Sequence, residues 1–162
     1  MKRAHSGDDD LYSEDVFWVL FDYEVTRSQR YPGPLTLIQI EMSPSASDPV
    51  MLSRAGSVFS SELNSHLRAA DISTGHGRNY RVLLPTTDEH GGRVVCERLL
   101  SVFRNRLGTR DANSFTFTVN IGMTSHPGGE SLSTEDMLGQ VEKALQRSRL
   151  KGSNTYVASS DL

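Results

Sequence analysis

The sequence contains a single cysteine, Cys96, and no apolar run long enough to cross a membrane. One cysteine can neither form a disulfide within the chain nor supply the paired thiolates of a zinc knuckle. The apolar runs fall short of the roughly 18 residues that a membrane span needs, and no signal peptide opens the chain. We therefore expect a cytoplasmic protein without a membrane partner, in which Cys96 is a small core residue.

Clusters of basic residues and metal-binding patterns of histidine are missing as well. The 17 lysines and arginines are scattered and the formal net charge is −3, whereas a nucleic-acid-binding domain usually carries a concentrated basic stripe. The five histidines show no metal-ligand spacing. We expect no nucleic-acid partner and no cofactor. The 162 residues suffice for one domain with a substantial core.

Apolar periodicity predicts helices and strands in alternation. The polar first ten residues indicate a disordered tail over residues 1–12, ahead of one domain over residues 13–162. Helices are expected over 14–30, over 49–69, after a cap at Thr87 or Asp88, and over 134–150; strands are expected over 34–42, 71–74, 79–84, 114–123 and 155–158. Ser133 and Asp136 have the spacing of a helix cap. The order predicts an α/β (α+β) sandwich, with helices packed on a mixed sheet.

Five segments, in the right order and spacing, resemble the GGDEF domain of diguanylate cyclases, which condense two GTP molecules into cyclic di-GMP. They are PLTLIQIEM (34–42), LRAADIS (67–73), RVLLPTTD (81–88), FTVNIGMTSHP (117–127) and VEKALQRSRLKGSN (141–154). The first resembles the family's first core strand, which ends in a metal-binding acid. The resemblance implies a nucleotidyl-cyclase palm-like fold, in which helices flank a central, mainly antiparallel five-stranded sheet.

The signature hairpin of this family, Gly-Gly-Asp/Glu-Glu-Phe, is degenerate here. It falls on His76, Gly77, Arg78, Asn79 and Tyr80, or on the last four of these with one residue deleted. In either register the acids are gone, and Tyr80 replaces the anchoring phenylalanine. Magnesium prefers carboxylate and phosphate oxygens, and a guanidinium repels it.

Other parts of the family's active half-site are missing too. SPSASDP (43–49) stands where the family has its guanine-reading segment. Glu41, at the end of the first core strand, is then a vestigial metal ligand or simply an exposed acid. We expect no metal site and no catalysis.

A second site of the family is retained in the sequence. Arg68 to Asp71 resembles the R-x-x-D motif of the inhibitory site (I-site), five residues before Gly77, and Arg98 falls where the family has a further arginine. A guanidinium can pair with guanine O6 and N7 or stack on the ring, and a carboxylate can accept from guanine N1 and N2. The resemblance implies an inactive receptor that binds cyclic di-GMP through Arg68, Asp71 and Arg98.

Two alternatives stay open. Arg68 and Asp71 have the spacing of an ordinary surface ion pair at a helix end, which contributes little. The chain would then be a nucleotide-independent scaffold for an unidentified protein partner or for a second copy of itself. The remaining alternative is binding or turnover of GTP.

Overall fold

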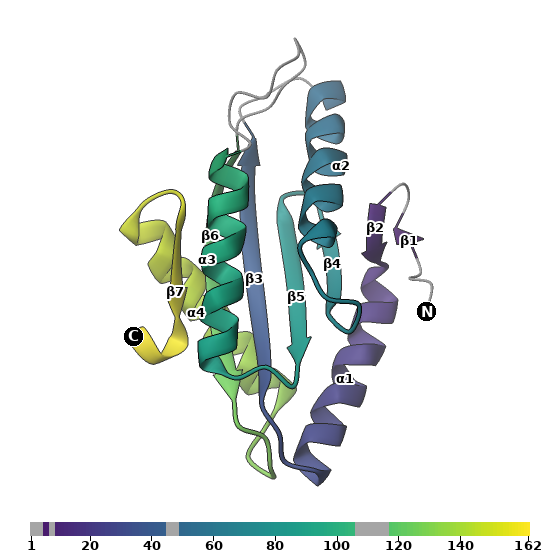
Figure 1. Cartoon of the computed structure of the whole chain (residues 1–162), viewed down its shortest axis with the longest axis vertical. Coiled ribbons are helices and arrows are strands. Elements are labelled where there is room, and N and C mark those ends of the chain that lie inside the picture. The colour runs from purple at the N-terminus through teal and green to yellow at the C-terminus, as the bar shows by residue number, and fades with distance from the viewer. Residues whose placement is uncertain (1–4, 7–8, 45–48, 106–116) are drawn as a thin grey trace.

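The computed structural model describes residues 5–6, 9–44, 49–105 and 117–162, and their elements are shown in Figure 1. The elements are β1 (His5–Ser6), β2 (Asp9–Tyr12), α1 (Glu14–Arg30), β3 (Leu35–Pro44), α2 (Pro49–Ser65), β4 (Ile72–His76), β5 (Asn79–Pro85), α3 (Glu89–Asn105), β6 (Phe117–His126), α4 (Thr134–Lys151), β7 (Thr155–Ala158) and the 3₁₀ turn η1 (Ser159–Asp161). The predicted order of helices and strands is confirmed from α1 onward. None of the helices in these ranges is both long and apolar enough to cross a bilayer.

The main sheet has five strands in the order β4-β5-β3-β6-β7. All neighbours are antiparallel except β6 and β7, which run parallel. β3 lies at the centre, where Gln39 pairs with Arg81 on one side and with Gly122 on the other. The predicted fold class is therefore confirmed, including β7 as an edge strand.

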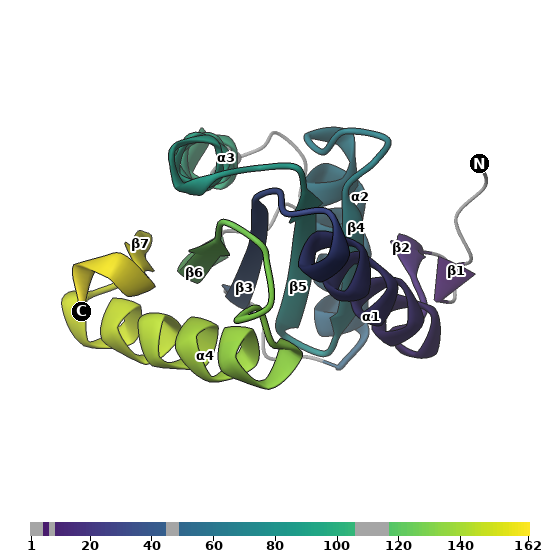
Figure 2. The same cartoon turned by 90° about the horizontal axis from the view of Figure 1, so that it is seen from below.

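Helices cover both faces of this sheet (Figure 2). Ile38, Ile40 and Met42 of β3 belong to the core cluster that contains residues of α2 and α3. Leu35 and Leu37 belong to the cluster that contains residues of α1 and α4. The alternation follows from the period of two along a strand. Cys96, on α3, is fully buried in the core, as predicted.

Local capping and close packing explain where the helices begin and how α4 is seated. The Ser133 hydroxyl accepts from the Asp136 N–H at 3.2 Å and caps α4 as predicted, and the Asp88 carboxylate accepts from the Gly91 N–H at the start of α3. A Cβ at Gly122 would collide with the backbone of α4. Only glycine in β6 lets α4 approach the sheet this closely.

The N-terminal boundary is a correction. Residues 9–12 form β2, which contacts α2 and β4, and Leu11 and Tyr12 are core residues. The predicted disordered tail over residues 1–12 therefore extends too far; residues 1–4 and 7–8 lie outside the described ranges. Two apolar residues after a polar stretch are too few to signal a strand, and their burial depends on the distant elements α2 and β4.

We expect Leu11→Ala to lower the free energy of unfolding by about 2–5 kcal/mol, because it leaves a cavity in the core between β2 and α2. The matched control is Val19→Ala, since Val19 on α1 is 67% exposed; its effect should stay within about 0.5 kcal/mol. Urea unfolding followed by circular dichroism measures both. Equal midpoints for wild type and Leu11→Ala would place the start of the domain after residue 12.

Candidate functional site

The degenerate hairpin is a tight two-residue turn. His76 and Asn79 form the last pair of β4 and β5, so Gly77 and Arg78 make the turn. Gly77 has a φ of +62°, and a positive φ at the first turn residue is typical of a type II′ turn, which favours glycine there. Arg78 is exposed at the tip. The tip therefore presents a cation, and no carboxylate lies in the turn or in the pair beneath it.

Tyr80 anchors this hairpin in the core below α2. Its side chain is 3% exposed, and its ring centroid lies 4.6 Å from that of Phe59. A Cβ at Gly75, its cross-strand partner, would overlap the tyrosine ring. The glycine on β4 thus makes room for the aromatic ring on β5, and the hairpin keeps its shape without acidic residues.

Glu41 is held by an arginine of α4. Nε and Nη2 of Arg149 donate to its two carboxylate oxygens at 3.1 and 2.7 Å, and Glu41 raises the pKa of the Arg149 guanidinium above its ordinary value. Asn79 is the cross-strand partner of Glu41, so the hairpin adds only an amide here. In the described part of the chain, no group of three or more His, Cys, Asp or Glu residues could hold a metal ion.

Arg68 and Asp71, two of the predicted I-site residues, contact each other directly. Asp71 is 1% exposed; its carboxylate accepts from the backbone N–H of Arg68 at 2.8 Å and from the guanidinium at 3.0 Å. The same guanidinium donates to the Thr87 hydroxyl at 2.7 Å and to the Pro85 carbonyl at 3.3 Å. The Arg68 side chain nevertheless remains 56% exposed. It is fixed on one side and open to solvent on the other.

Arg98, the third predicted I-site residue, reaches the same loop from α3. Its Nη2 donates to the His66 carbonyl at 3.0 Å, two residues before Arg68. The structure therefore brings both arginines to the segment between α2 and β4. The segment 43–49, predicted to replace the guanine-reading residues, lies largely outside the described residues.

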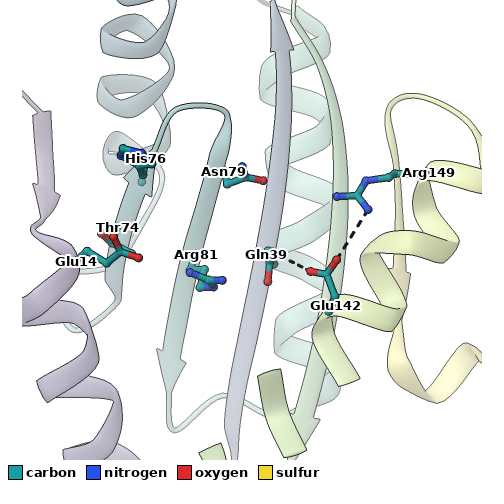
Figure 3. Close-up of a pocket in the computed structure, with 9 residues that line it drawn as sticks. Glu14, Gln39, Thr74, His76, Asn79, Arg81, Glu142 and Arg149 are labelled. Atoms are coloured by element: carbon teal, nitrogen blue, oxygen red, sulfur yellow. Dashed lines mark hydrogen bonds and ion pairs between the residues drawn. The ribbon is translucent and has the colours of Figure 1, made fainter. Parts of the chain in front are cut away.

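A pocket of about 350 Å³ lies below the hairpin on the face of the sheet between α1 and α4 (Figure 3). Its lining residues are Glu14, Gln39, Thr74, Gly75, His76, Asn79, Arg81, Glu142 and Arg149. Gln39 donates to the Glu142 carboxylate at 3.1 Å, and Glu142 lies 3.9 Å from Arg149. Sequence reasoning missed Gln39, Arg81, Glu142 and Arg149. Two sequence signals could have indicated all but Arg81. Gln39 and Glu41 stand at alternate positions of a strand, and Glu142 and Arg149 are seven residues apart on α4, so each pair lies on one face of its element.

No protein-family model matches the sequence, and no curated protein matches it. Solved structures do match. The diguanylate cyclase SiaD from Pseudomonas aeruginosa, solved with its activator SiaC, superimposes with a TM-score of 0.79 at 19% identity; the match covers 97% of this chain and 62% of the length of that chain.

Two isolated domains match over most of their length. The active GGEEF domain of a diguanylate cyclase from Vibrio cholerae has a TM-score of 0.75 at 15% identity, covering 91% of this chain and 96% of that one. The GGDEF domain of DgcB from Caulobacter crescentus, solved with c-di-GMP, has a TM-score of 0.74 at 14% identity, and the match covers 96% of this chain and 95% of that one. The likeness concerns the fold, and this chain has the fold of the GGDEF domains of diguanylate cyclases, as the sequence motifs predicted.

Proposed function

We propose that this chain is a catalytically inactive GGDEF-like domain that acts in cyclic di-GMP signalling as a receptor. The observation that carries the inactivity is the bidentate bond between Arg149 and Glu41, next to a hairpin without acids. Joining a 3′-hydroxyl to an α-phosphate requires divalent metal ions. These ions need oxygen ligands in near-octahedral geometry, and the remaining acid of this region is already paired.

Electrostatics strengthens this argument. A magnesium ion that binds Glu41 must displace two charge-assisted hydrogen bonds, which are among the stronger ones in proteins. The displaced Arg149 guanidinium would remain beside the metal, and like charges at such distances repel. Asn79, across from Glu41, offers a neutral amide oxygen in place of a second carboxylate. Metal binding is therefore disfavoured by both charge and ligand number.

Ligand binding is proposed at Arg68 and Arg98. The Arg68 guanidinium is oriented by Asp71, Thr87 and Pro85 while more than half of the side chain faces solvent. An arginine held in this way loses little side-chain entropy when it binds a phosphate or a guanine edge. The solved complex of the DgcB GGDEF domain with c-di-GMP supports this ligand class.

Asp71 takes a different role in this proposal from the one that the motif implies. Its carboxylate is buried and bonded to Arg68, so it positions the arginine, and guanine contacts come from the arginines themselves. The N1–H and N2–H groups of a guanine could donate to the Asp71 carboxylate only after the Arg68 guanidinium turned away. We therefore treat Asp71 as a positioning residue.

A protein-docking role is the second candidate, and α1 favours it. Val19 and Tyr23 lie one turn apart and are 67% and 64% exposed, so they form an apolar strip on the helix surface. Trp18, on the same helix, is half-buried and stacks on Phe21. The structure of SiaD with its activator SiaC supports a protein partner for a domain of this fold.

Incubation of the purified chain with GTP and Mg²⁺ should yield no cyclic di-GMP, because Glu41 and the hairpin cannot assemble a metal site. Chromatography of the nucleotides after overnight incubation measures this, with an active diguanylate cyclase as the positive control. Accumulation of cyclic di-GMP above the level of a protein-free sample would contradict the proposed inactivity.

Calorimetric titration with cyclic di-GMP should give a micromolar dissociation constant, and Arg68→Ala should weaken it about tenfold or more, a loss of about 1.4 kcal/mol. Arg147→Ala is the matched control, because Arg147 is an exposed arginine on α4. GTP with Mg²⁺ is titrated in parallel. Absence of heat with both nucleotides would contradict the receptor proposal and leave the docking role. Heat with GTP alone would favour the alternative in which the chain binds or turns over GTP.

Asp71→Ala should lower the free energy of unfolding by about 1–3 kcal/mol, because the partly buried N–H donors of Arg68 lose their acceptor, and it should also weaken cyclic di-GMP binding. Asp71→Asn keeps an acceptor oxygen and should recover part of both losses. Asp22→Ala, on the exposed surface of α1, is the control. Urea unfolding and calorimetry measure the two effects, and unchanged affinity in Asp71→Ala would rule out a positioning role.

A further inference from the structure

Arg81, on β5, is a sheltered arginine that lines the pocket between α1 and α4. Its guanidinium lies over the Trp18 ring, 5.4 Å from the centroid. Its Nε is buried and has no hydrogen-bond partner, and no other described residue accepts from the guanidinium. The cation–π contact attracts the charge of the guanidinium, but it does not satisfy the N–H donors of the group.

Two charged residues that line the pocket with Arg81 already have partners of their own: Glu142 is bonded to Gln39 and Arg149 is paired with Glu41. Thr74 and Gln39 are the cross-strand partners of Arg81. Figure 3 shows Arg81 between the Thr74 side and the Gln39 side of the pocket, with Glu14 near Thr74. The pocket therefore contains an unpaired guanidinium and space for a small molecule.

An arginine that is partly removed from water without an acceptor loses hydration and gains no hydrogen bond in return. An oxyanion in the pocket would supply the missing acceptors, and the guanidinium fork matches a carboxylate or a phosphate through two parallel bonds. The cation–π contact with Trp18 positions the guanidinium before the ligand arrives. The vacant acceptor position thus points to an anionic ligand.

The charges that line the pocket distinguish the two kinds of oxyanion. Glu14 and Glu142 line the same space as Arg81, and the second lining arginine, Arg149, is already paired with Glu41. The two carboxylates therefore repel a multiply charged phosphate more strongly than a singly charged carboxylate. The two carboxylates also accept hydrogen bonds from hydroxyl groups. We propose that this pocket binds a small organic carboxylate through Arg81, with a hydroxyl group of the ligand directed at Glu14 or Glu142.

This site does not depend on the proposed cyclic di-GMP function. Arg98 lies on α3, which packs on the other face of the sheet from α1 and α4, and neither Arg68 nor Arg98 lines the pocket. Either site can therefore be present without the other, and variants of Arg81 leave the two arginines of the proposed receptor site in place.

Trp18 is the only tryptophan of the chain, so its fluorescence reports on the group that stacks over it. The full chain is titrated with sodium acetate, sodium glycolate and sodium phosphate, with sodium chloride at matched ionic strength, and the thermal midpoint is recorded at each concentration. We expect a saturable fluorescence change and a rise in midpoint with acetate, and saturation at lower concentration with glycolate, which adds a hydroxyl group. Stabilisation by a bound ligand follows its concentration relative to the dissociation constant.

Arg81→Gln should weaken the apparent affinity for acetate about tenfold or more, while Arg78→Gln, at the exposed tip of the same hairpin, should leave it unchanged. If Arg81→Gln does not fold, Arg81→Lys keeps the charge without the fork and carries the same test. A response to acetate no larger than that to chloride, or one that survives both Arg81 variants, would overturn the site. Tighter saturation by phosphate than by acetate would overturn the assignment to a carboxylate.

Discussion

The pairing of β3 with both β5 and β6 is the constraint on which the rest of the molecule depends. The strand is bonded on both edges and packed on both faces, so its register decides which side chains meet. Ile38 and Ile40 enter the core beneath α2 and α3, and Gln39 and Glu41 turn toward α4. A slip of one residue would exchange the two sets. The buried alternate residues therefore secure the placement of the polar ones.

Close packing of α4 on the sheet brings charged side chains of the helix to the polar residues of β3. Since Gly122 allows the helix to lie against β6, Glu142 reaches Gln39 and Arg149 reaches Glu41. The strand end that would otherwise present a free carboxylate presents a neutralised ion pair. The hairpin adds no carboxylate to this strand end, since its turn and last pair carry Arg78 and Asn79. Arg149 also lines the pocket proposed for a carboxylate, so the ion pair that neutralises Glu41 adjoins that pocket.

Local patterns predicted most of the fold and part of the candidate site. Apolar periodicity predicted α1 and β3 to within a residue or two. The spacing of Arg68 and Asp71 allowed an ion pair as an alternative to ligand binding, and the structure shows that contact. The burial of Asp71 was not predictable, because it depends on the loop that carries Pro85 and Thr87. The bond between Glu41 and Arg149 joins residues 108 positions apart. Such pairs are set by topology, which the periodicity of single elements does not encode.

The two proposed ligand sites use arginine in opposite ways, and one strand connects them. Arg68 is oriented by Asp71, Pro85 and Thr87 and remains exposed on its other side. Arg81 instead contacts an aromatic ring, and its Nε has no hydrogen-bond partner. Arg68 bonds to the carbonyl of Pro85, the last residue of β5, and Arg81 lies four residues earlier on the same strand. Two ligands bound on opposite faces of the sheet can influence each other only if the protein has two conformations and each ligand makes different contacts in them. β5 is the element that both sites share, since it carries Arg81 and its Pro85 carbonyl accepts from Arg68.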